Sequence, residues 1–167
     1  MEALHVSGFH RLFEGPHPPI WNTEMPAVNG VISARALADL YAPLANEGRA
    51  GDAEYLRPQT VQTLGKVQVR TVDAVLGIQM RWRLGYHHAF GTGRDGPLAF
   101  GHYGYGGSGG WADPATGMSL GFVTNRIGSL TTPLGDLNLF RLNRLVRQCL
   151  ESRDAGGGAL PRETAEA

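Results

Sequence analysis

The segment from Phe100 to Asn125, FGHYGYGGSGGWADPATGMSLGFVTN, constrains the fold of this chain more than any other. The order of its residues predicts a strand ending in His-x-Gly, a glycine-rich bend, an Asp-Pro turn and a return strand. Glycines along a strand let backbone N–H groups approach a ligand without an intervening side chain. The whole chain has 24 glycines among 167 residues, about twice the average share. We therefore expect antiparallel β structure with tight turns or close contact between backbone and ligand.

Composition excludes several classes of function. Fifteen Lys and Arg balance 15 Asp and Glu, so no basic surface for nucleic acid is expected. A hydrophobic fraction of 42% favours a folded domain over disorder, and 167 residues suffice for one domain with a core. No run approaches the ~18 apolar residues of a membrane span, and no signal peptide is seen. We expect no membrane span and, by default, a cytoplasmic protein.

Cysteine and histidine usage predicts neither a metal nor a cofactor. Cys149 is the single cysteine, so no intrachain disulfide can form, and we expect a buried thiol on a helix. His87, His88 and His102 suggest a metal site, but no Cys, Asp or Glu stands beside them at ligand spacing.

Periodicity and breaker residues predict the elements. Helices are expected at 34–46, with Ser33 as N-cap, at 58–64 and at 134–151. The predicted strands cover 78–86, 98–104, 109–112 and 118–124. The last strand is apolar on both sides, as in the centre of a sheet. Residues 1–30, rich in Pro and Gly, predict an extended lead-in, and residues 154–167 a disordered tail.

Two common motifs match the glycine-rich bend without their structural context. Residues 104–109, GYGGSG, fit the G-x-G-x-x-G of dinucleotide-binding proteins, but Trp111 and an Asp-Pro turn follow where a helix is needed. Residues 106–110, GGSGG, fit the G-x-S-x-G nucleophile elbow around Ser108. In that elbow's fold the histidine follows the serine, whereas all six histidines here precede Ser108.

A third interpretation rests on a longer, collinear set of segments. FGHYGYGGSGGWADPATGMSLGFVTNR resembles the third active-site strand and turn of the β-lactamase-related serine hydrolases, a group that includes class C-type β-lactamases, penicillin-binding proteins and related esterases. MPAVNGVISARALADLYAPLANEG and LRPQTVQTL are similar to two upstream segments of that family. The resemblance extends over roughly residues 24 to 151. Histidine at the position where many β-lactamases have lysine suggests the esterase branch.

The resemblance implies a role for each residue of the His-x-Gly strand. His102, Tyr103 and Gly104 take the three motif positions, and the backbone N–H of Tyr105 becomes the candidate oxyanion-hole donor. His102 would donate a hydrogen bond or, if protonated, offer a charge to the substrate. Tyr103, Gly104 and Gly106 are the candidate substrate-binding positions.

Two other motifs of the family are absent. No serine has a lysine three residues on, no tyrosine has an asparagine two residues on, and Lys66 is the single lysine. The S-x-x-K nucleophile and the Y-x-N proton carrier are therefore missing. We expect the C-terminal portion of a hydrolase for esters or amides such as β-lactams, inactive alone. The alternative is a non-enzymatic module that pairs with a complementing N-terminal chain, or with itself, through an open strand edge.

The predicted fold class is α+β, an antiparallel sheet of three to four strands flanked by helices, as in part of a β-lactamase or transpeptidase fold. Residues 1–30 would form the lead-in, 31–153 the C-terminal part of the β-lactamase-like domain, and 154–167 the tail.

Overall fold

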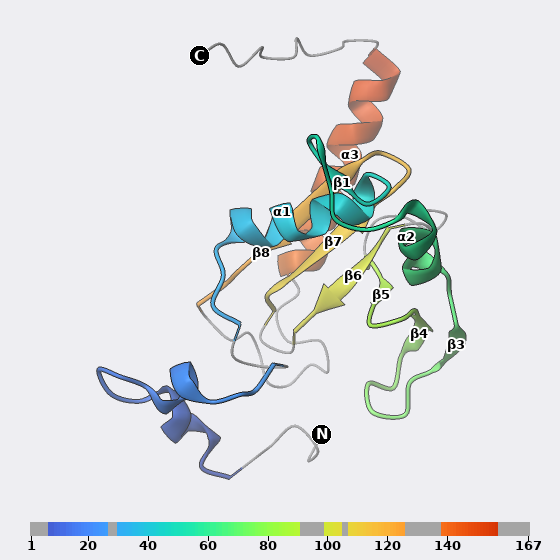
Figure 1. Cartoon of the computed structure of the whole chain (residues 1–167). Helices are drawn as coiled ribbons and strands as arrows, with labels where there is room; N and C mark the ends of the chain where they lie inside the picture. The colour runs from blue at the N-terminus through green and yellow to red at the C-terminus, as the bar shows by residue number, and fades with distance from the viewer. Residues whose placement is uncertain (1–6, 27–29, 91–98, 105–106, 126–137, 157–167) are drawn as a thin grey trace.

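A six-stranded antiparallel sheet forms the centre of the molecule (Figure 1). The computed structural model describes residues 7–26, 30–90, 99–104, 107–125 and 138–156. The sheet order β3-β4-β5-β6-β7-β8 follows the chain, so every strand pairs with its sequence neighbour. The strands are β3 Val69–Val72, β4 Gln79–Trp82, β5 His87–His88, β6 Phe100–Tyr103, β7 Gly109–Asp113 and β8 Met118–Phe122. The predicted α+β class is confirmed, with more strands than expected.

Helices cover both faces of this sheet (Figure 1). Helix α1, Ala34–Ala45, lies over β7 and β8, and α3, Asn138–Gly156, lies on the opposite face. Helix α2, Pro58–Gly65, is joined to the sheet where Arg83 Nε donates to the Gly65 carbonyl at 2.7 Å. A small hairpin, β1 Arg49–Ala50 and β2 Ala53–Glu54, follows α1. In the described part of the chain, no helix has the length and apolarity that a membrane crossing requires.

The core has one cluster on each face of the sheet. On the α1 side, Phe100 and Ala112 pack with residues of α1 and α2. On the α3 side, Trp111 packs with neighbours that include Tyr103 and Val146. Because side chains alternate across a strand, β6 and β7 contribute to both clusters.

Helix α1 begins and ends where the sequence predicts. The Ser33 side chain accepts a hydrogen bond from the Ala36 N–H at 3.1 Å, which is the expected N-cap. Pro43 lies in the last turn, and its carbonyl accepts from the Gly48 N–H at 2.7 Å. Gly48 has a φ of 92°, a conformation that favours glycine and ends the helix.

Two glycines of the segment 100–125 allow α1 to lie directly on the sheet. A Cβ added at Gly121 would lie 2.3 Å from the Ala34 carbonyl oxygen and 2.7 Å from the Ala38 nitrogen. A Cβ at Gly110 would lie 2.7 Å from the ring of Tyr41. At these two positions, the absence of a side chain therefore lets helix α1, rather than a ligand, come close to the strand backbone.

Several expectations need correction. The strand predicted over 78–86 stops at Trp82, because the chain turns at Gly85, which has a φ of 78°. The predicted central strand, β8, lies at the edge of the described sheet. Cys149 is exposed rather than buried.

The ends of the chain also differ from expectation in detail. Two 3-10 turns, η2 Phe9–Phe13 and η3 Pro19–Asn22, interrupt the predicted extended lead-in. Helix α3 continues to Gly156, beyond the predicted end at Glu151. Residues 157–167, most of the predicted tail, lie outside the described residues.

Candidate functional site at the end of β6

The candidate site lies at the C-terminal end of β6, where the His-x-Gly residues leave the sheet. On one side β6 pairs with β7 as far as Tyr103. On the other side, the pairing with β5 stops at the pair His87–Gly101. Beyond Gly101, the outer edge of His102 and Tyr103 therefore has no strand partner among the described residues. Such an edge can offer backbone groups to a bound molecule.

His102 is exposed at this edge. It is two residues beyond Phe100, so both side chains project on the α1 face of the sheet. Desolvation by the surrounding protein lowers the pKa of His102 below the ordinary histidine value. The imidazole is therefore mainly neutral near pH 7, when it donates or accepts a hydrogen bond rather than supplying a charge.

Tyr41 of α1 reaches the same strand from the helix side. Burial, together with the nearby Tyr86, raises the pKa of the Tyr41 hydroxyl to about 12, and a backbone hydrogen bond with His102 partly opposes this rise. The hydroxyl therefore stays protonated at neutral pH. Helix α1 thus contacts the backbone of β6 at His102, next to the candidate site.

Tyr103 points to the other face, toward α3. Its hydroxyl accepts a hydrogen bond from Asn143 Nδ2 at 2.8 Å, and burial raises its pKa above the ordinary tyrosine value. The side chain is thereby held in the core. A contact between Tyr103 and substrate, as the resemblance implies, would fall to its backbone carbonyl, because the Tyr103 N–H donates to His87 Nε2.

A tight bend follows β6. The Gly104 N–H donates to the Ser108 carbonyl at 2.7 Å, and the Gly107 N–H donates to the Gly104 carbonyl at 3.0 Å. Gly107 has a φ of 93°, which explains glycine at this position. The other two residues assigned by resemblance, Tyr105 and Gly106, lie outside the described residues.

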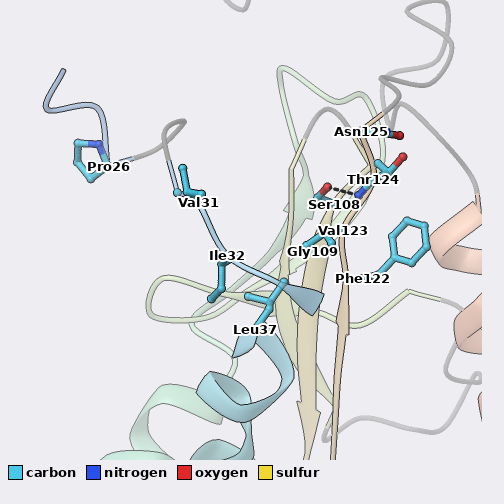
Figure 2. Close-up of a pocket in the computed structure, with 11 residues that line it drawn as sticks. Pro26, Val31, Ile32, Leu37, Ser108, Gly109, Phe122, Val123, Thr124 and Asn125 are labelled. Carbon is cyan, nitrogen blue, oxygen red and sulfur yellow. Dashed lines mark hydrogen bonds between the residues drawn. The ribbon is translucent and has the colours of Figure 1, made fainter. Parts of the chain in front are cut away.

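Ser108 has a structural contact that accounts for its presence. Its hydroxyl oxygen accepts a hydrogen bond from the Thr124 N–H at 3.0 Å, which joins the start of β7 to the end of β8 (Figure 2). The contact agrees with the sequence argument against a nucleophile elbow.

A hollow of about 890 Å³ opens beside this contact (Figure 2). Its walls come from the segment before α1, from α1 itself, and from the ends of β7 and β8; the lining residues are Pro26, Gly30, Val31, Ile32, Leu37, Ser108, Gly109, Phe122, Val123, Thr124 and Asn125. The lining is mostly apolar, and Val31 is 87% exposed. The hollow lies at the same end of the sheet as the bend at Gly104.

Sequence reasoning missed two residues that hold this region. Asn143 of α3 is fully buried and binds β7, β6 and the Phe90 carbonyl at once.

His87 is buried beneath the outer edge of β6 and was considered only as a metal ligand. In the described residues, no group of three His, Cys, Asp or Glu side chains is arranged to hold a metal ion. An adjacent pair of histidines in a short strand was the only signal for His87.

Solved structures with a similar fold indicate the class of protein. A penicillin-binding protein homologue from Caulobacter crescentus superimposes with a TM-score of 0.62 at 30% identity, over 70% of this chain and 31% of its own. A family VIII carboxylesterase gives 0.60 at 26% identity, over 70% of this chain and 31% of its own. EstA from Arthrobacter nitroguajacolicus Rue61a gives 0.54 at 28% identity, over 76% and 33%.

The sequence agrees with this class. The Beta-lactamase family model matches residues 5–138, and the chain belongs to that family. The esterase/beta-lactamase LipL of Mycobacterium tuberculosis is 37% identical over 131 residues, which are 78% of this chain and 30% of LipL. The chain thus spans about a third or less of the length of these relatives.

Proposed function

We propose that this chain forms one wall of the active site of a serine hydrolase that cleaves small esters or amides, including β-lactams. The observation that carries the proposal is the outer edge of β6, free of strand pairing beyond Gly101 and presenting His102. Related proteins are named as an esterase/beta-lactamase and a carboxylesterase, which supports an ester as substrate. A cytoplasmic location belongs to the same proposal.

Acyl transfer places negative charge on a carbonyl oxygen, and a preorganised N–H aimed at that oxygen contributes roughly 3–4 kcal/mol. We assign this donor to the backbone of Tyr105, directly after the motif glycine. Neutral His102 would donate a hydrogen bond to the substrate or its leaving group. Gly104, which has no side chain, leaves the approach to the strand open, and Gly106 stays a proposed substrate-binding position.

The chain alone lacks the group that attacks. With no S-x-x-K and no Y-x-N in the sequence, neither nucleophile nor base is available for a covalent intermediate. These groups would come from a complementing polypeptide that carries both motifs.

The test is a hydrolysis assay with a nitrophenyl ester and a chromogenic cephalosporin. We expect no turnover by the purified chain, and turnover after mixing with the N-terminal part of a family relative. A His102→Ala variant should lower the restored rate. Turnover by the chain alone that is abolished by Ser108→Ala would contradict the proposal and indicate an unrelated serine enzyme.

A second candidate is a non-enzymatic module that self-associates or binds a partner chain through β8. The observation that favours it is that β8 pairs with β7 alone among the described strands. The exposed apolar residues Val31 and Val123 both line the hollow of Figure 2, and Val123 directly follows β8. A stable complex without hydrolysis in the same mixing experiment would favour this candidate.

A further inference from the structure

The backbone of Tyr103 lies beyond the end of strand pairing on the β5 side. Strand β5 has two residues, and its pairs with β6 are His87–Gly101 and His88–Phe100. The Tyr103 N–H points toward β5, past the last of these pairs. A buried N–H without a partner would destabilise the strand end.

The imidazole of His87 takes the place of the missing strand. Its Nε2 accepts the hydrogen bond from the Tyr103 N–H at 3.2 Å. Its Nδ1 lies 2.8 Å from the His88 carbonyl oxygen, which can only accept, so Nδ1 carries the proton. Both ring nitrogens are thus used, and the neutral Nδ1–H tautomer is the one that satisfies both contacts.

The surroundings hold this ring in place. His87 is 4% exposed, and its ring contacts Trp82, Phe90 and Tyr103 at centroid distances of 5.8, 5.2 and 5.0 Å. The titratable or charged groups that face it are His88, His102, Arg83 and Tyr103. Among the residues that the structure describes, no carboxylate faces the ring. Burial lowers the pKa of His87 to about 4, which agrees with a neutral ring that accepts a hydrogen bond.

We propose that His87 is a positioning residue: its Nε2 replaces a strand partner for the Tyr103 N–H and so fixes the outer edge of β6 between His102 and Gly104. The ring of His87 lies 5.3 Å from that of His102, measured between centroids. The same side chain therefore lies beside the His102 ring and binds the Tyr103 backbone. The importance of this edge for hydrolysis rests on the proposed function. The hydrogen bond itself does not depend on it.

The experiment is nuclear magnetic resonance on the ¹⁵N-labelled chain, which requires no activity. We expect a scalar coupling across the N–H···N bond between the Tyr103 amide and His87 Nε2. On acidification, the Tyr103 amide signal should move together with protonation of His87, at a pH well below the ordinary histidine range. In His87→Leu, exchange of the Tyr103 amide should be faster by about tenfold or more, and the amide signals of His102 and Gly104 should shift.

The matched control is His88→Leu on the same strand. His88 Nδ1 is buried and has no hydrogen-bond partner in the described part of the chain, so this variant removes a neighbouring imidazole but no bond to Tyr103. It should leave Tyr103 exchange near the wild-type rate. Absence of the coupling, equal Tyr103 protection in His87→Leu, or unmoved His102 and Gly104 signals would each overturn the proposal. Should His87→Leu fail to fold, the coupling and the pH titration of the wild-type chain decide.

Discussion

At the scale of single residues, buried Asn143 connects three separate segments of the molecule. Its Oδ1 accepts from Trp111 Nε1 at 2.7 Å, and its Nδ2 donates to the Phe90 carbonyl and the Tyr103 hydroxyl at 2.7 and 2.8 Å. All of its polar atoms are therefore satisfied, although the side chain is 0% exposed. One amide thereby joins α3 to β6, to β7 and to the segment after β5.

Replacing Asn143 should be costly because three buried partners lose their hydrogen bonds together. We expect Asn143→Ala to lower the free energy of unfolding by about 2–4 kcal/mol. Urea denaturation of both proteins measures the difference. Gln148→Ala, at an exposed position of the same helix, is the control and should change stability by less than about 0.5 kcal/mol. Equal effects of the two changes would show that the network contributes nothing beyond helix propensity.

The two histidines of β5 predict a loss of stability in mild acid. Burial lowers the pKa of His87 and of His88 to about 4 in the folded chain, from an ordinary value of 6.5. Between these values the unfolded chain binds more protons than the folded one, so stability falls as the pH drops from 6.5 to 4. His87 alone accounts for up to about 3 kcal/mol over this window.

Denaturation midpoints measured at intervals between pH 7 and pH 4 test this expectation. His87→Gln, which cannot be protonated, should show a shallower decline than wild type. A wild-type midpoint that is constant down to pH 4.5 would contradict the argument.

At the scale of elements, sequence patterns located the strands and helices better than their packing. Turn residues and apolar runs predicted β6, β7 and β8 to within two residues, because the ends of these strands are set by local turn sequence. Strand β3 was missed because all four of its residues are exposed and carry no alternating pattern. On α3, the apolar residue Leu145 is 58% exposed, whereas the polar residue Asn143 is buried. Partners distant in sequence decide that orientation, so periodicity cannot reveal it.

The close contact between α1 and β8 at Gly121 predicts how a larger residue there would change stability. Gly121→Ala should destabilise the chain by about 2 kcal/mol or more, because the new methyl group would meet the backbone of α1, which cannot rotate away. Thermal unfolding gives the change in Tm. Gly30→Ala is the matched control, since a Cβ there has no heavy atom within 4 Å. If both variants melt together, α1 can move outward without cost.

At the scale of the whole molecule, the sequence predicted where the candidate site lies but not what holds it. His102 and Gly104 were identified because the motif is a contiguous run with turn residues around it. The supports from His87, Tyr41 and Asn143 come from separate elements, and their bonds to β6 appear only once the chain is folded. The family match, which extends over about a third or less of its relatives' length, agrees with a site that needs further residues.

The edge of β8 that no described strand pairs with gives the last prediction. Backbone groups alternate sides along a strand, and the Thr124 N–H points toward β7, where it binds Ser108. Counting back, the Ser119 N–H points to the open side, so Ser119→Pro removes an outward donor without breaking the ladder to β7. We expect this variant to unfold near the wild-type midpoint but to bind a complementing polypeptide at least about tenfold more weakly, because an added strand would meet the proline ring. Titration calorimetry measures the affinity, and Ser119→Ala should bind like wild type. Undiminished binding by the proline variant would place the partner elsewhere, with the hollow beside Val31 and Val123 as the next surface to test.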